Sequence, residues 1–244
     1  MADGVTLRMN DAKVRQALEQ AGKQARFAAA MAATKTGQRV KVALQEEMRK
    51  VFDRPSSYTI GAVGLVRATK DNLSARIVIK ENGGKGTPAW KYLGPQIHGG
   101  DRGHKRFEKA LQSRGILPRN MFAVPGGAAR MDGFGNMSRG QIVQILSDLG
   151  AFAENGYRAN RSHRRKAEYF AIPKGQGLTP GIYRRIETGG KVIFRPVLIF
   201  IRRPRYTKRL RWYEVAAEVS AEHFEAEFAQ AYTMALATAY ARRP

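Results

Sequence analysis

Hydrophobic positions recur at helical spacing toward both ends of this 244-residue chain. Two apolar stripes near the N-terminus predict helical structure that ends before Pro55. Because Gly22 and Gly37 weaken the helix between the stripes, the pattern is compatible with one long bent helix or with two helices in succession. A further helix is predicted over residues 210–241. The N-terminal stripes consist of Val14, Leu18, Ala21, Ala25 and of Val40, Leu44, Met48, Val51, Phe52.

A hydrophobic period of two, typical of strands with one buried face, appears in two parts of the chain. Residues 65–69 and 73–79 alternate on either side of a polar turn and predict a β-hairpin. Three segments rich in Ile, Tyr, Phe and Val, at 168–172, 181–186 and 191–201, predict further strands. The Gly189-Gly190 pair predicts a hairpin turn between the last two. We expect these five strands to form one antiparallel sheet.

Residues 81–140 carry thirteen of the 25 glycines and predict an extended, Gly-rich loop insertion. Short helices are expected within or next to it, at residues 105–114 and 138–149, and Ser138 is suited to cap the second. Residues 138–166 therefore combine a helix with a basic segment. The expected fold is a single α+β domain over residues 1–244, with a long N-terminal helix, a mostly antiparallel sheet and a C-terminal helix.

Composition narrows the class of protein. The chain has no cysteine, which excludes disulfides, thiolate metal sites and cysteine nucleophiles. No signal peptide is recognisable, and the strongly apolar run 197–201 is far too short to cross a bilayer. We expect a soluble, intracellular protein with a sizeable core and no membrane contact.

Charge is the most informative feature of the composition. The chain has 43 Lys and Arg residues against 20 acidic residues, and residues 155–211 alone hold sixteen cations against two acids. Such a density favours contact with DNA backbone or with an acidic protein surface, although solvated charge remains an alternative. No known motif for reading nucleic-acid sequence is present. The expected contact residues are Arg158, Arg161, Arg164, Arg165, Lys166, Arg202, Arg203, Arg205, Lys208 and Arg209.

The C-terminal helix carries the opposite charge. Residues 212–241 contain no Lys or Arg, and four carboxylates lie on one predicted helix face: Glu214, Glu218, Glu222 and Glu225. A basic surface and an acidic stripe in one chain predict head-to-tail self-association, with the acidic stripe at a subunit interface. A solvated helix face is the alternative.

The sequence gives only weak signals for a catalytic site. His98, Asp101 and His104 lie in a Gly-rich segment and could be drawn as a metal or nuclease site. The surrounding cations, among them Arg102 and Lys105, disfavour a metal ion there. We therefore expect no enzyme activity, no cofactor and no metal site, and keep a metal-dependent nuclease as the weaker alternative.

Four strings of the sequence are distinctive as a set: MRKVFDRP at 48–55, KGTPAWKYLGP at 85–95, HKRFE at 104–108 and NMSRGQIVQIL at 136–146. Together they resemble phage and prophage minor tail proteins of the Z type. The similarity runs through most of the chain from about Ala43.

This resemblance implies a structural virion protein that completes the tail and joins it to the DNA-filled head at the neck, after assembly in the host cytoplasm. It also implies an α+β fold shared with neck and tail-terminator proteins, and a homo-oligomeric ring, a hexamer being favoured, around the DNA passage. Its expected neighbours are tail-terminator, tail-tube or head-connector proteins. Within the second string, Trp90 and Tyr92 are expected at a subunit interface. A sequence-independent nucleic-acid-binding protein is the main alternative function.

Overall fold

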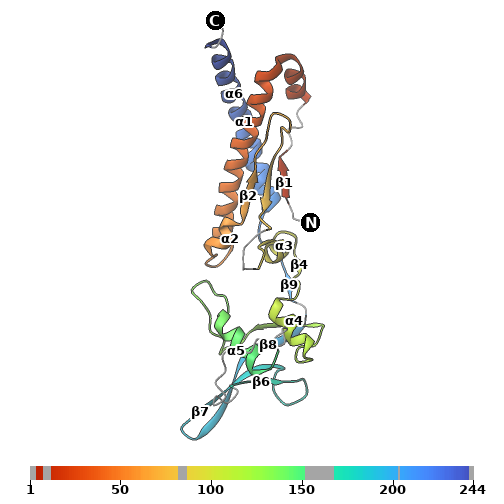
Figure 1. Ribbon diagram of the computed structural model, residues 1–244, viewed down its shortest axis with the longest axis vertical. Helices are drawn as coiled ribbons and strands as arrows, with labels where there is room; N and C mark the ends of the chain where they lie inside the picture. Colours follow the sequence, from red (N-terminus) through yellow and green to blue (C-terminus); the bar gives the residue numbers. More distant parts are fainter. Residues whose placement is uncertain (1–3, 8–11, 82–86, 152–167, 203, 242–244) are drawn as a thin grey trace. The chain divides into compact units, whose positions relative to one another are not determined.

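The computed structural model describes residues 4–7, 12–81, 87–151, 168–202 and 204–241, which form an α+β fold (Figure 1). The chain divides into two compact units. Unit 1 comprises Met1–Gly100 and Thr207–Pro244, and unit 2 comprises Asp101–Tyr206. The sequence predicted one domain with a loop insertion at 81–140, whereas the inserted part of the chain is longer and has a sheet and core of its own.

Two long antiparallel helices, α1 (Ala12–Val51) and α6 (Trp212–Ala241), form the framework of unit 1 (Figure 1). The expected break in the first helix occurs at Gly22, whose φ of 68° is outside the helical region. Small side chains on both helices, including Ala28, Ala32 and Ala231, are fully buried. Arg39 of α1 donates to the buried Glu227 of α6 at 2.9 Å and fixes their register.

A three-stranded antiparallel sheet, in the order β1-β3-β2, packs on α1. The predicted hairpin is confirmed as β2 (Val63–Val66) and β3 (Ala75–Ile79). In β3, Ala75, Ile77 and Ile79 are buried while Arg76 is exposed, as its period of two requires. Strand β1 (Gly4–Leu7) was not predicted, because only four residues form it.

Two short helices complete unit 1. Helix α2 (Ser57–Gly61) begins at Ser56, whose side chain accepts a hydrogen bond from the Thr59 amide. Helix α3 (Trp90–His98) lies where the sequence predicted loop, and that prediction was wrong, because buried Leu93 and Ile97 anchor the helix despite its internal Pro95. The core formed around these elements includes Leu44, Met48, Ile77, Leu93 and Trp212.

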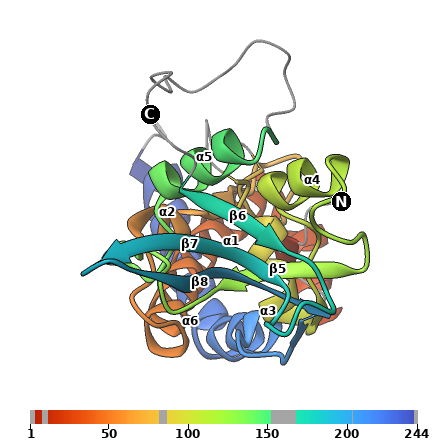
Figure 2. The same cartoon turned by 90° about the horizontal axis from the view of Figure 1, so that it is seen from below.

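A four-stranded antiparallel sheet, in the order β5-β8-β7-β6, is the framework of unit 2 (Figure 2). Its strands are β5 (Met121–Pro125), β6 (Tyr169–Ile172), β7 (Gly181–Thr188) and β8 (Lys191–Arg202). The last three confirm the predicted strands, and Gly189 and Gly190 have the positive φ angles of the predicted turn. The single five-stranded sheet was wrong, because β2 and β3 belong to the other unit and β5 completes this one.

Helices α4 (Arg106–Ser113) and α5 (Arg139–Asp148) confirm the two short helices expected near the Gly-rich segment. Ser138 is the residue at the start of α5, but its side chain makes no capping hydrogen bond. Leu111 of α4 and Ile145 of α5 share a core with Ile182, Leu198 and Phe200 of the sheet. These three strand residues point to one face, which the two helices cover (Figure 2).

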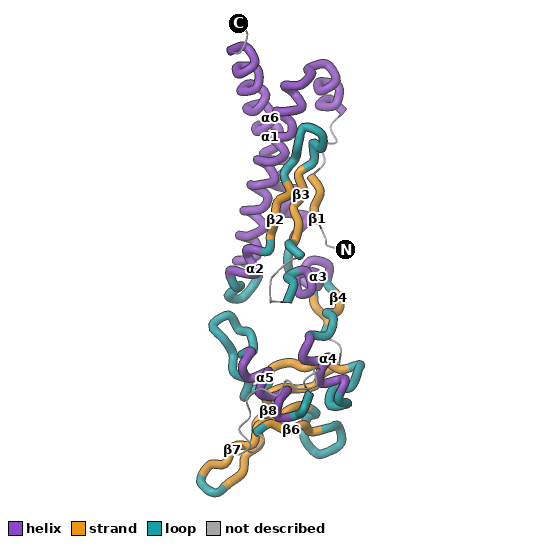
Figure 3. The backbone as a smooth tube through the Cα atoms, viewed as in Figure 1, coloured by secondary structure: helices purple, strands orange, loops and turns teal. Residues whose placement is uncertain are grey.

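A short ribbon marks the boundary between the units in the sequence. Strand β4 (Gly100–Asp101) pairs with β9 (Arg205–Tyr206), so the chain enters and leaves unit 2 through adjacent strands (β4 and β9 are labelled in Figure 1, and Figure 3 colours strands orange). Of the helices within the described ranges, none is long and apolar enough to cross a bilayer.

Candidate interaction surfaces

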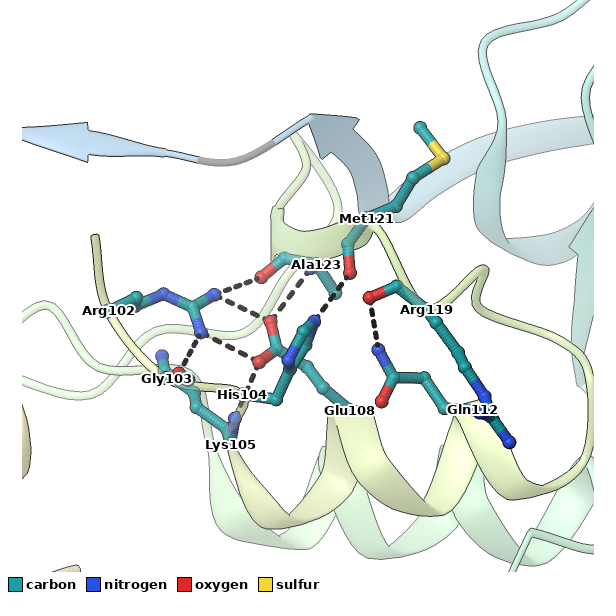
Figure 4. A network of polar contacts seen from close by, with 9 residues as sticks. All are labelled: Arg102, Gly103, His104, Lys105, Glu108, Gln112, Arg119, Met121 and Ala123. Carbon is teal, nitrogen blue, oxygen red and sulfur yellow. Dashed lines mark hydrogen bonds and ion pairs between the residues drawn. The ribbon is translucent and has the colours of Figure 1, made fainter.

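A buried ion pair holds the start of unit 2 in place (Figure 4). Arg102 donates to both carboxylate oxygens of Glu108, at 2.7 and 2.6 Å. The Glu108 side chain is fully buried, and its oxygens also accept from the backbone amides of Lys105 at 2.6 Å and Ala123 at 2.8 Å. The carboxylate thus ties the residues before α4, the first turn of α4 and strand β5 together.

The pKa of Glu108 follows from this environment. Burial alone raises the pKa of the carboxyl, because it disfavours the charged form. The Arg102 guanidinium and the two backbone amides act together in the opposite direction and outweigh burial, so that the pKa lies below its ordinary value. Glu108 is therefore a charged structural residue at neutral pH.

His98, Asp101 and His104, weighed above as a weak metal or nuclease site, are divided between the two units. His98 belongs to unit 1, whereas Asp101 and His104 belong to unit 2. His104 Nε2 lies 3.1 Å from the Met121 carbonyl oxygen, and its ring stacks on Phe122 at a centroid distance of 4.1 Å. Within the described residues, no group of three His, Cys, Asp or Glu side chains could hold a metal ion.

The outer hairpin, defined as residues 185–195, extends β7 and β8 beyond their neighbours. Along β7, the pairing with β6 extends no further than Arg184. Along β8, the pairing with β5 begins at Leu198. Apart from the Arg185 amide, which donates to the Glu168 carbonyl at 3.0 Å, the described strands pair the outer hairpin only with itself. It is therefore a two-stranded ribbon, which is marginally stable when alone.

Large apolar side chains are exposed on this ribbon. Val192, Ile193 and Phe194 are 44%, 43% and 49% exposed. The register places Ile186 opposite Ile193 on one face and Val192 and Phe194 on the other face, so neither face is purely polar. The Phe194 ring also contacts the Phe170 ring edge to face, with the ring centroids 5.0 Å apart. An exposed apolar patch with polar neighbours indicates a surface that meets another molecule.

The outer hairpin is also basic. Lys191 and Arg195 are exposed, and Arg185 forms a solvent-exposed ion pair with Glu187 at 2.8 Å. Three cations and one carboxylate leave the segment with a formal charge of +2. Arg184, just inside it, pairs with Glu168.

The basic residues singled out from the sequence fall in different places. Arg158, Arg161, Arg164, Arg165, Lys166 and Arg203 lie outside the described residues. Arg202 and Arg205 are exposed in unit 2, whereas Lys208 and Arg209 belong to unit 1. Arg209 donates to the Val51 carbonyl at 2.6 Å, at the C-terminal end of α1. This guanidinium therefore has a structural contact in its own chain.

The acidic stripe on α6 is divided between internal pairs and exposed groups. Glu214 pairs with Lys208, and Glu218 pairs with Arg211 at 2.5 Å. Glu222 and Glu225 are exposed, and a Glu222 carboxylate oxygen lies 3.8 Å from His223 Nε2. Only the second half of the predicted stripe therefore presents carboxylates that face solvent without a Lys or Arg ion pair among the described contacts.

Trp90 and Tyr92 differ in exposure. The Trp90 side chain is 39% exposed, with the Lys91 ammonium 5.4 Å from the ring centroid. Tyr92 is half-buried, and its hydroxyl lies 3.2 Å from the Thr59 hydroxyl. Burial raises the pKa of the Tyr92 hydroxyl. Trp90 is thus available to a partner, whereas Tyr92 contributes to packing within unit 1.

Sequence reasoning missed two exposed apolar features. Val192, Ile193 and Phe194 have the sequence pattern of a buried strand. They are exposed because the hairpin extends beyond the end of β6. The loop between β5 and α5 presents Met131 and Phe134, about half-exposed. The Asp132 side chain accepts from the Phe134 amide at 2.9 Å and holds this loop in shape. The D-G-F-G string was a usable signal for that turn.

Comparisons with protein-family models, with curated proteins and with solved structures found no match to this chain.

Proposed function

We propose that this protein is a structural component of a phage or prophage virion, which completes the tail and joins it to the head at the neck. It does so as a homo-oligomeric ring around the DNA passage. The proposal draws the class of particle from the resemblance of four sequence strings to minor tail proteins of the Z type. It draws the mode of action from the surfaces of the two units.

The observation that carries the assembly role is the presence of two exposed surfaces of opposite charge in one chain. The outer hairpin is basic and apolar, whereas α6 has exposed carboxylates and lacks any cation between Trp212 and Ala241. A chain with a formal charge of +23 repels its own copies unless cations of one copy meet carboxylates of the next. Opposite charges at different places on the subunit support head-to-tail contacts, which close into rings or propagate as filaments.

Deleting the gene from its phage or prophage and viewing the induced lysate by negative-stain electron microscopy tests the proposed role. We expect DNA-filled heads beside separate, full-length tails, or joined particles that fail to inject. Complementation with the intact gene should restore infectious particles. Normal infectious virions from the deletion strain would remove the tail-completion role.

Sequence-independent nucleic-acid binding is the second candidate. The exposed Arg202 and Arg205 of unit 2, with the half-buried Tyr206, favour contact with a phosphate backbone. For this function, the affinity for duplex DNA should fall by roughly 0.9 log unit per log unit of salt for each phosphate neutralised. Replacing Arg202 and Arg205 with Ala should reduce that slope, and an unchanged slope would exclude them as phosphate contacts.

A further inference from the structure

The outer hairpin lacks the support that the rest of its sheet receives. Helices α4 and α5 and strands β5 and β6 cover or flank the inner parts of β7 and β8. Residues 185–195 extend beyond these strands, and their exposed apolar side chains lie on both faces of the ribbon. Burying Val192, Ile193 and Phe194 against a partner would stabilise a ribbon that is marginal on its own.

The composition of the outer hairpin favours a protein partner over nucleic acid. Val192 and Ile193 are aliphatic and cannot hydrogen-bond to phosphate or stack as aromatic rings do on bases. Arg185 is already paired with Glu187. The exposed cations Lys191 and Arg195 lie on the same face of the ribbon as Ile193, so a surface complementary to that face needs a hydrophobic strip with carboxylates beside it.

Helix α6 carries such a surface. Phe224, Phe228 and Tyr232 stack along one side of the helix, with ring centroids 6.4 and 6.0 Å apart, and all three are half-buried. The exposed Glu222 and Glu225 lie within the same turns. The small residues Ala221 and Ala229 are exposed there and allow another backbone to approach closely.

We propose that the outer hairpin of one copy docks on the 221–232 region of α6 of a second copy. Ile193 would contact the aromatic stack, and Lys191 and Arg195, which lie on the same face of the ribbon as Ile193, would face Glu222 and Glu225. The contact is heterologous, because each copy offers a hairpin to one neighbour and a helix face to the other. The inference deepens the self-assembly part of the proposed function and rests on it.

Disulfide trapping tests this contact directly, because the chain contains no cysteine. One tagged copy carries Ile193→Cys and an untagged copy carries Ala221→Cys or Ala229→Cys. The two full-length proteins are mixed and oxidised, and a mixture of Lys174→Cys with the same α6 variants is the control. Lys174 is exposed in unit 2, in the loop between β6 and β7.

The expected result is a mixed disulfide-linked dimer at least about tenfold more abundant than in the control, since a persistent contact gives the two thiols a millimolar effective concentration. A chain carrying Ile193→Cys and Ala221→Cys together should form a ladder of higher oligomers. Three outcomes would overturn the contact: yields equal to the control, cross-links only between two hairpins, or a cross-link confined to one chain.

DNA binding provides a further outcome and separates the two proposals. If Phe194→Ser abolished binding to duplex DNA while no mixed dimer formed, the hairpin would be a nucleic-acid surface and the contact between copies would be refuted. Failure of the cross-link would refute this contact but not the tail-completion role, because another surface could assemble the ring. Normal virions without the gene would refute the tail role even if the cross-link formed.

Discussion

The inner and outer parts of the β7–β8 hairpin are the same two strands in different environments. Inside the four-stranded sheet, Ile182 and Val197 are fully buried and Leu198 is nearly so. Beyond it, Val192, Ile193 and Phe194 are 43% to 49% exposed. Equivalent hydrophobic residues therefore stabilise unit 2 in one part and remain available to a partner in the other. Variants of the inner part should alter folding, whereas variants of the outer part should alter association.

The largest effect on the inner region should come from Glu108→Gln. This change leaves Arg102 buried without its ionised partner, and it removes the charged acceptor for the Ala123 amide of β5. Breaking a buried ion pair in this way costs about 3–5 kcal/mol. Chemical denaturation followed by circular dichroism and intrinsic fluorescence should show this loss in the free energy of unfolding.

Glu187→Gln is the matched control for that variant. Glu187 pairs with Arg185 on the outer hairpin, and both side chains are more than half exposed. The expected loss is about 0–1 kcal/mol. Equal losses in the two variants would contradict the distinction between the buried pair and the exposed pair.

Gly181→Ala should have the next largest effect. A Cβ atom at this position would lie 2.2 Å from the Leu198 carbonyl oxygen, a backbone atom of the paired strand. The strands must separate locally, which costs about 1–3 kcal/mol. Gly127→Ala serves as the control, because a Cβ atom added there would meet nothing within 4 Å. A Gly181→Ala protein as stable as the control would show that β7 and β8 can be displaced freely.

Acid should weaken the inner region through Glu108. The pKa of this carboxyl is lower in the folded chain than its ordinary value, so its contribution is complete above the ordinary value and declines as pH falls toward the folded pKa. The free energy of unfolding should therefore decrease as the pH is lowered below about 4.5. In Glu108→Gln this part of the pH dependence should disappear, and an unchanged slope would contradict the assignment.

The smallest effect on stability should come from the outer hairpin. Ile193→Thr keeps a β-branched residue at an exposed position, and the free energy of unfolding should change by only about 0.5 kcal/mol. The same substitution at buried Ile182 should cost several times more, because it places a hydroxyl in the core of unit 2. Comparable losses at the two positions would show that the outer hairpin is buried by its own chain.

The strands and the terminal helices could be predicted because their hydrophobic periods reflect local geometry. Ala75, Ile77 and Ile79 alternate with polar or less buried residues, and this period survives in β3. The Gly-rich segment was misleading, since helix α3 forms around Leu93 and Ile97 even though Gly94 and Pro95 lower its helical propensity. Tertiary burial outweighed local preference there.

The candidate surfaces were less predictable than the fold. Charge counts indicated a basic region and an acidic helix, but pairs such as Arg211 with Glu218 depend on distances in the folded chain. The run Val192-Ile193-Phe194 looks like a core strand in any sequence window. Its exposure depends on where β5 and β6 stop pairing, which is a property of the whole sheet.

Self-association of charge-reversed variants, measured by sedimentation equilibrium, tests the contact between copies most directly. Lys191→Glu with Arg195→Glu, and separately Glu222→Lys with Glu225→Lys, should each weaken self-association roughly tenfold, while Lys174→Glu and Glu46→Lys should not. Combining the two reversed pairs in one chain should restore association to within about threefold of the original. A combined variant that associates no better than either parent, or parents that associate like the unmodified protein, would contradict the account.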